Sequence, residues 1–170
     1  FIAKCGLLTF AGPMPIVDFA ADISPFTEEH FWKMITSNKK IGKLSQPENE
    51  KIFPIIKGDV KARIVGGNLS NIVNLIGTEY MPYLKDKILF MEEIAEYPYK
   101  IDRMLNQLQL TKIIPNLKGI LLGAFVDCHE HDYSKRTLTL GEVIQDFFSQ
   151  VKIPVMYNLK HGHIKDKLTL

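Results

Sequence analysis

The chain has 170 residues, of which 46% are hydrophobic and 24% are charged, and its formal net charge is +2. A chain of this length suits one domain with a real core, or two small domains at most. Acidic and basic residues are interspersed and no apolar run approaches the roughly 18 residues of a membrane span, so we expect neither a nucleic acid nor a membrane as partner.

The cysteine count and the two ends of the chain bear on its cellular context. Cys5 and Cys128 are too few for a disulfide framework, which suits the reducing cytoplasm, and we expect a cytoplasmic protein. Residues 1–6 resemble the last turn of a helix stopped by glycine, and residues 168–170 stop in what resembles the middle of a strand. We therefore expect a piece of a longer protein.

The first 50 residues predict a short strand, a helix and a linker. Residues 7–10 predict a short strand, and residues 24–38 a helix with apolar side chains at helical spacing. Phe26 and Trp32 in that helix indicate core packing, with a wall of a substrate cleft as the alternative. Residues 39–50 are polar and rich in turn formers, and we expect them to form a linker.

The remaining residues, 51–170, predict an α/β domain. Strands at 51–56 and 60–65, joined by a turn at 57–59, indicate a short hairpin. Strands and helices then alternate to the end of the chain, which predicts a largely parallel sheet flanked by helices. The further elements expected are a helix after residues 66–68, a strand ending near Glu92, a helix from Pro98, a strand at 119–126, a helix at 140–150 and a strand at 154–157.

Two polar side chains are expected at the carboxyl edge of this sheet, where open α/β sheets carry their chemistry. Glu92 ends one strand, and His163 follows Gly162 in a loop after another strand. A nucleophilic hydrolase needs a histidine base and a carboxylate that orients it, so the pair fits that chemistry. Spacing alone equally fits a solvated glutamate and a surface histidine. Glu93 is the weaker candidate, because neighbours along a strand point to opposite faces.

Residues 66–70, with the sequence Gly-Gly-Asn-Leu-Ser, connect a predicted strand to a predicted helix. A glycine pair at that position lets a ligand approach the backbone, and a helix amino terminus attracts an anion. A tight structural turn explains the same residues equally well. Neither the Walker nor the dinucleotide-binding spacing of glycines is present.

A third cluster, residues 127–132, has the sequence Asp-Cys-His-Glu-His-Asp, which contains several metal-ligating side chains. The pair His129 and His131, two residues apart, can face one metal ion. Adjacent residues cannot all converge on one ion, and no second cysteine pair or His-Glu-x-x-His helix supports a zinc site. We therefore expect no native metal, and keep as an alternative a zinc hydrolase that combines this cluster with His161 and His163.

Five ordered motifs make the chain similar to the LD-carboxypeptidases, serine peptidases with a Ser-Glu-His triad. The motifs are Gly66-Gly67-Asn68-Leu69, Leu89-Phe90-Met91-Glu92-Glu93-Ile94-Ala95-Glu96, Pro98-Tyr99 with Arg103 and Leu105, Gly123-Ala124-Phe125, and Gly162-His163. Gly12-Pro13 also fits, and the likeness covers almost the whole chain. It implies the carboxyl-terminal domain of a two-domain hydrolase.

The resemblance implies roles for individual residues. Glu92 would be the triad carboxylate and His163 the general base, while Asn68 and Gly67 would contact the substrate. Glu96 and Arg103 would anchor the corner between strand and helix. The family serine lies in a Gly-x-Ser-Asp turn, and no serine here has that context: Ser24, Ser37, Ser45, Ser70, Ser134 and Ser149. The nucleophile is therefore expected upstream of Phe1, and residues 1–50 would follow its domain; this chain alone should be inactive.

The implied reaction is removal of the terminal D-alanine from a murein tetrapeptide in cell-wall recycling, with no cofactor. The expected partners are the murein peptide, the protein's own amino-terminal nucleophile domain and, in a homodimer, a second copy. The alternatives are an amide hydrolase like the microcin C self-immunity branch of the family and a degenerate domain that binds without catalysing.

Overall fold

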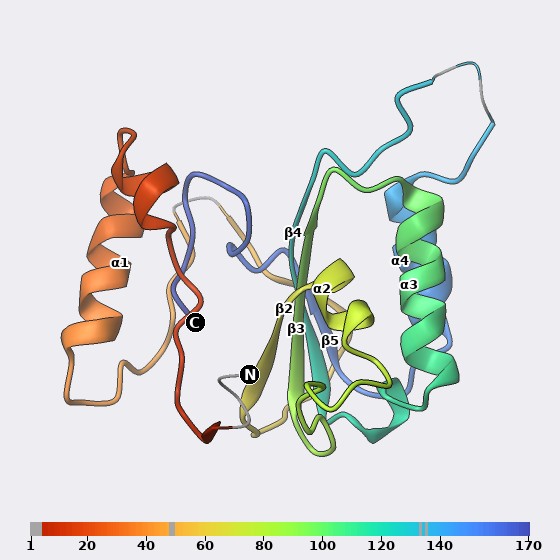
Figure 1. Cartoon of the computed structure of the whole chain (residues 1–170), viewed down its shortest axis with the longest axis horizontal. Helices are drawn as coiled ribbons and strands as arrows, with labels where there is room; N and C mark the ends of the chain where they lie inside the picture. Colours follow the sequence, from red (N-terminus) through yellow and green to blue (C-terminus); the bar gives the residue numbers. More distant parts are fainter. Residues whose placement is uncertain (1–4, 48–49, 133, 135) are drawn as a thin grey trace.

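A five-stranded mixed sheet organises the chain in the computed structural model, which describes residues 5–47, 50–132, 134 and 136–170 (Figure 1). The strand order is β1-β5-β4-β3-β2, with β1 antiparallel to β5 and the remaining neighbours parallel. The strands are β1 (Phe53–Ile56), β2 (Ile64–Asn68), β3 (Ile88–Ile94), β4 (Gly119–Val126) and β5 (Val155–Tyr157). The helices are α1 (Pro25–Thr36), α2 (Leu69–Asn74), α3 (Pro98–Leu110) and α4 (Leu140–Ser149), with short turns at Pro15–Phe19 and Ile114–Asn116. The predicted α/β fold is confirmed.

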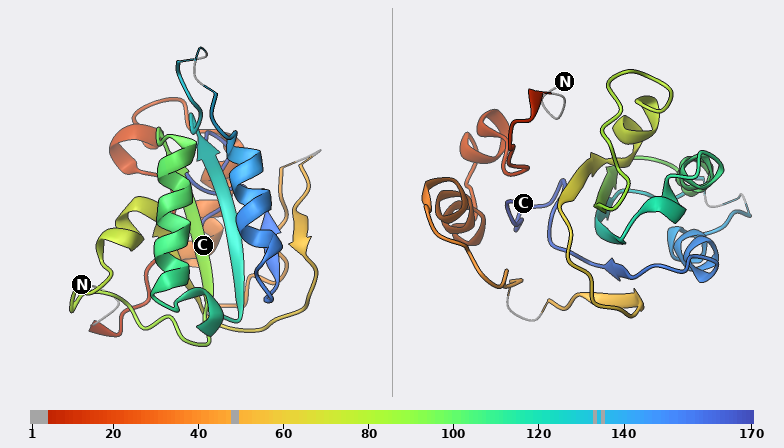
Figure 2. Two further views of the ribbon diagram at one scale, coloured as in Figure 1. Left: turned by 90° about the vertical axis from the view of Figure 1, so that its right-hand side faces the viewer. Right: turned by 90° about the horizontal axis from the view of Figure 1, so that it is seen from below.

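The two faces of the sheet are covered differently, and β3 shows the division. Leu89 and Met91 point to the main core, which α2, α3 and α4 complete, whereas Phe90 between them points to a small cluster with Leu159 and Leu168. This alternation follows from the two-residue period of a strand. Figures 1 and 2 show α3 and α4 on one side of the sheet, and the carboxyl-terminal segment between α1 and the other side.

The predicted helices form where their capping residues stand. Ser24 accepts the backbone N–H of Thr27 at the start of α1, and Asn68 accepts that of Asn71 at the start of α2. Thr139 and Glu142 form a reciprocal capping box at α4. These side chains satisfy amide groups that the first helical turn leaves without partners, which explains why the helix starts could be predicted.

The predicted hairpin at residues 51–65 is wrong. Strands β1 and β2 lie at opposite edges of the sheet, and the chain between them passes beneath the amino-terminal ends of β5 and β4. A Cβ at Gly58 would lie 2.2 Å from the Pro154 side chain, and one at Gly119 would lie 3.2 Å from Val60. The glycine of the supposed turn thus permits a close crossing under the sheet.

The predicted strand at residues 7–10 does not form, and its leucines are exposed. The chain instead exchanges two backbone hydrogen bonds between Ala11 and Leu170, of 3.0 and 2.9 Å. The expectation of a helical turn at the start falls largely on residues 1–4, outside the described residues. Trp32 is 48% exposed rather than in the core, with its ring against Phe19 and Phe31.

The amino-terminal segment is fastened to the carboxyl-terminal one by polar contacts. The Lys167 ammonium donates to both carboxylate oxygens of Asp18, at 2.8 and 2.9 Å, and Thr27 bonds the backbone of residues 165 and 167. Burial would raise the pKa of Asp18, but hydrogen bonds from Lys167 and from the Met14 backbone outweigh it and hold that pKa below its ordinary value. No helix within the described ranges is long and apolar enough to cross a membrane.

Candidate active site

Glu92 and His163, which are 71 positions apart in sequence, form a hydrogen-bonded pair. His163 Nδ1 lies 2.8 Å from Glu92 Oε2; the carboxylate side chain is only 6% exposed, whereas the imidazole is 34% exposed. A carboxylate can only accept, so Nδ1 carries the hydrogen, and in the neutral imidazole Nε2 keeps a free lone pair. A buried acid that fixes one tautomer of a partly exposed histidine is the geometry of a base that activates a nucleophile.

Two glycines let the His163 segment reach Glu92. Gly162 has φ +124, and a Cβ there would lie 2.9 Å from Glu92 Oε2. A Cβ at Gly123 on β4 would lie 2.6 Å from the carbonyl oxygen of His161 and 3.2 Å from Glu92 Cβ. The segment around residues 161–163 therefore passes close over β4 and reaches β3. Glycine is required in the Gly-His and Gly-x-Phe motifs because a side chain at either position would block this close approach.

The segment is also held from its outer side by the linker. Gln46 accepts the backbone N–H of Lys160 at 2.7 Å and donates to the Asn158 carbonyl at 2.8 Å, while the Lys160 ammonium pairs with Glu50 at 2.8 Å. Sequence reasoning missed Gln46, because a glutamine in a polar linker carries no pattern that indicates a distant partner.

His161 is structural. Its Nδ1 donates to the Leu168 carbonyl at 2.6 Å, and its ring meets Phe90 edge-on at 4.8 Å. Burial lowers the pKa of His161, so the neutral imidazole predominates at neutral pH. Its position fixes the backbone two residues before His163.

Glu93 points to the opposite face from Glu92, as the strand alternation predicts. Its carboxylate is 2% exposed and accepts from the Asn68 amide at 2.6 Å, from the Ser70 hydroxyl and N–H at 2.6 and 2.8 Å, and from the Ile94 N–H at 3.0 Å. Fixed donors surround it, and it connects β3 to the end of β2 and the start of α2.

Asn68 and Gly67, the predicted substrate contacts, lie beside the pair. Asn68 is the register neighbour of Glu92, yet its side chain caps α2 and binds Glu93. One amide hydrogen and one lone pair remain for a ligand. Gly67 has φ +152, where glycine is favoured, and a Cβ there would meet no atom within 4 Å. Their role toward substrate stays a prediction.

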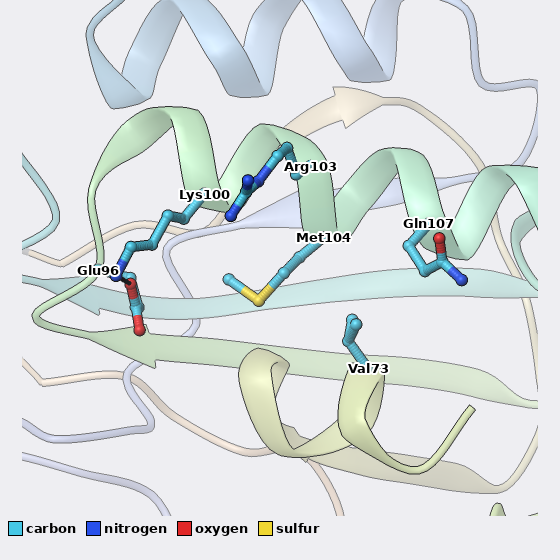
Figure 3. Close-up of a pocket in the computed structure, with 6 residues that line it drawn as sticks. All are labelled: Val73, Glu96, Lys100, Arg103, Met104 and Gln107. Carbon is cyan, nitrogen blue, oxygen red and sulfur yellow. Dashed lines mark ion pairs between the residues drawn. The ribbon is translucent and has the colours of Figure 1, made fainter. Parts of the chain in front are cut away.

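A cavity of 310 Å³ lies on the helix side, away from the Glu92–His163 pair (Figure 3). It is lined by Val73, Glu96, Lys100, Arg103, Met104 and Gln107. Glu96 pairs with Lys100 across one helical turn at 2.9 Å, and the Arg103 guanidinium lies 5.5 Å from the Tyr99 ring. These contacts fit the expected structural role at the start of α3.

The metal-ligating side chains after β4 divide into two groups. Asp127, His129 and His131 are exposed and gather, whereas Cys128 is buried, and its thiol donates to the Val126 carbonyl. Burial raises the pKa of the Cys128 thiol. Among the residues that the structure describes, no metal-ligating group of three includes His161 or His163. The zinc-hydrolase alternative is therefore not supported.

None of the serines in the described part of the chain is hydrogen-bonded to His163. Ser70, the nearest to a plausible nucleophile by sequence, donates its hydroxyl to Glu93 on the other face. Among the described residues, the site thus brings together an imidazole and the carboxylate that binds it.

Comparison with known proteins confirms the resemblance to the LD-carboxypeptidases. Residues 61–170 match the profile of the family described as the LD-carboxypeptidase C-terminal domain. A Bacillus subtilis protein named "Probable murein peptide carboxypeptidase" is 31% identical over 97% of this chain and 51% of its own length. The microcin C7 self-immunity protein MccF of Escherichia coli is 30% identical over 99% of the chain and 55% of its length. The chain thus spans about half the length of these relatives.

Solved structures of two proteins are similar to this chain in fold and in sequence. The muramoyltetrapeptide carboxypeptidase from Oxalobacter formigenes is 34% identical with a TM-score of 0.78, covering 95% of this chain and 54% of that one. MccF in complex with glutamyl sulfamoyl guanosine is 27% identical with a TM-score of 0.77, covering 99% and 57%. The likeness therefore extends over nearly all of the chain.

Proposed function

The chain belongs to the LD-carboxypeptidase family, whose carboxyl-terminal domain it contains, and from that premise we propose that it supplies the acid and the base of a serine peptidase triad. The observation that carries the proposal is the 2.8 Å contact between Glu92 and His163 Nδ1, with the imidazole partly exposed. Glu92 is the triad carboxylate and His163 is the general base.

The proposed mechanism assigns each proton. His163 Nε2 takes the hydroxyl proton of a serine as its oxygen attacks the amide carbonyl, and Glu92 stabilises the resulting imidazolium. The imidazolium then gives that proton to the leaving amine as the carbon–nitrogen bond breaks. Water, deprotonated by the same imidazole, releases the acyl group from the serine. No step requires a metal or an organic cofactor.

The serine is expected in a region upstream of Phe1, and the proposed partner of this domain is that nucleophile-bearing region of the same protein. The active site then lies where the two meet, a common place for clefts. Residues 1–50 lead from that region into the α/β domain of residues 51–170. A cytoplasmic location and a homodimer remain part of the proposal.

The proposed substrate is a murein tetrapeptide that loses its terminal D-alanine. The support is the likeness to the Oxalobacter muramoyltetrapeptide carboxypeptidase and the Bacillus relative. A second candidate is an amide-like bond in a peptidyl nucleotide, favoured by the match to MccF over 99% of the chain. A domain that binds without catalysing is the third.

The test is an assay of the full-length protein with two substrates, a murein tetrapeptide and a peptidyl sulfamoyl nucleoside. We expect D-alanine release from the first, and His163→Ala should lower kcat by about 10⁶-fold, as loss of the triad histidine does elsewhere. Binding of the peptide should survive, because His163 acts on the reacting bond.

Thermal unfolding of the His163→Ala protein serves as the control, since a partly exposed histidine contributes little to the core. Faster turnover of the nucleoside substrate would favour the second candidate. Tetrapeptide binding without turnover by the unaltered protein would favour the third. Full activity of His163→Ala would contradict the proposed base.

A further inference from the structure

The loop between β4 and α4 extends beyond the end of the sheet, and its first residues alternate in exposure (Figures 1 and 2). Asp127, His129 and His131 are exposed, whereas Cys128 is 4% exposed and Glu130 is half-buried. The buried cysteine fastens the segment to the body of the domain, and the exposed side chains of Asp127 and His129 stand on either side of it.

The three outer side chains place their ligand atoms together. One atom from each of Asp127, His129 and His131 lies within 4.8 Å of the other two. His129 Nδ1 is 3.3 Å from Asp127 Oδ1, and the two imidazole centroids are 4.5 Å apart. Zinc-to-ligand bonds of about 2.0–2.1 Å in a tetrahedron separate two ligand atoms by about 3.3 Å. The Asp127–His129 pair already has that separation.

The surroundings hold the cluster in place. The Tyr97 ring meets the His131 ring edge-on at 5.6 Å and stacks on Tyr99 at 5.9 Å. Tyr97 is fixed as the residue that precedes α3, and the Val126 carbonyl accepts the Ala95 N–H at 2.9 Å. The aromatic ring thus limits the freedom of His131, and the backbone hydrogen bond limits that of the chain just before Asp127.

From this geometry we propose that Asp127, His129 and His131 bind a divalent cation of the zinc class, at a site distinct from the Glu92–His163 pair. Two imidazole nitrogens and one carboxylate oxygen suit zinc, nickel or copper, whereas magnesium and calcium prefer a set made entirely of oxygens. Three protein ligands leave room for water at the remaining position. The bound ion fastens the start of the loop to the end of β4.

The experiment is a calorimetric titration of the full-length protein, freed of metal by a chelator and desalted, with zinc chloride and separately with magnesium chloride. We expect one equivalent of zinc and no magnesium to bind. Replacing a direct ligand should weaken the site by at least about 10-fold, the smaller effect reported for an outer-shell partner. His129→Ala and His131→Ala should each show this loss, and the double variant should not bind.

The matched control is Glu130→Gln, in the same loop but outside the ligand set, which should bind zinc like the unaltered protein. Zinc should also shift the imidazole NMR signals of His129 and His131 and leave that of His161 in place. A zinc isotherm unchanged in the double variant would overturn the proposal. So would binding that disappears in His163→Ala, because the ion would then occupy the Glu92–His163 pair.

Discussion

The two faces of β3 carry the same acid in two different settings. On the helix face, Glu93 is 2% exposed and accepts four hydrogen bonds from donors on β2, α2 and β3. On the other face, Glu92 binds the imidazole of His163, whose ring is 34% exposed. One carboxylate is saturated by fixed neighbours and connects parts of the fold. The other orients a group that can exchange protons with the outside.

The sharpest way to test this difference is the same substitution on each face, assayed in the full-length protein. Glu92→Gln should lower kcat about 10⁴-fold, because the amide cannot stabilise an imidazolium and favours the wrong tautomer. Glu93→Gln should lower turnover by less than 10-fold, but it should reduce the free energy of unfolding by about 1–3 kcal/mol, because an amide nitrogen then faces donors. Both are measured by D-alanine release and by denaturant unfolding.

The opposite pattern would break the comparison. If Glu93→Gln abolished turnover while Glu92→Gln remained active, the triad carboxylate would lie on the helix face. Equal damage at both positions would leave the catalytic acid unassigned.

A smaller loss of kcat is expected when a side-chain atom is added next to Glu92 and neither Glu92 nor His163 is replaced. In Gly162→Ala the new Cβ would lie 2.9 Å from Glu92 Oε2, at a φ of +124 that alanine rarely adopts. His163 must then move, and a displacement of about 1 Å costs about 100-fold in rate. The assay is kcat on the tetrapeptide, with KM changing much less.

Gly141→Ala is the matched control for this prediction. Gly141 lies in α4, and a Cβ there would approach no atom closer than 3.9 Å. Turnover should be unchanged, and the helix should gain about 0.5–1 kcal/mol in stability. Equal activity of both alanine variants would show that the close approach of Gly162 to Glu92 does not position His163.

Of the two faces of the sheet, the one covered by α2, α3 and α4 could be predicted better from the sequence than the one that carries His163. These helices follow from apolar spacing and from caps such as Asn68 and Thr139, because both signals act within one or two turns of chain. The separation of Glu92 from Glu93 follows from the strand period alone. The failures came where distant segments meet: Gly58 packs against Pro154 rather than making a turn, and Gln46 holds residues 158–160. Spacing within a segment contains no information about such partners.

The pairing of Glu92 with His163 was predictable for a related reason. Glu92 and His163 are ordinary as single residues, and the ordered motifs around them indicated the pair. The structure adds why the glycines belong to those motifs, since Gly123 and Gly162 make room for the crossing segment. Spacing alone could not distinguish the three outward ligands after β4 from their buried neighbour Cys128, because that depends on how the loop leaves the sheet.

The smallest predicted effect concerns the Asp18–Lys167 contact, which fastens the segment on the His163 face. Because the pKa of Asp18 is lower in the folded state, its contribution to stability is present above its unfolded pKa and is lost as the pH falls through the lowered value. Asp18→Asn should cost about 1 kcal/mol at pH 7, or about 5-fold in the amide protection of residues 15–19, measured by hydrogen exchange in the full-length protein. Once the pH is below the lowered folded-state pKa of Asp18 the two proteins should converge, and Asp22→Asn, at an exposed aspartate nearby, should match the unaltered protein throughout. Equal protection of the Asp18→Asn and unaltered proteins at pH 7 would show that apolar packing, not this ion pair, holds the segment. The segment on the His163 face would then be held mainly by apolar contacts, as the helices on the other face are.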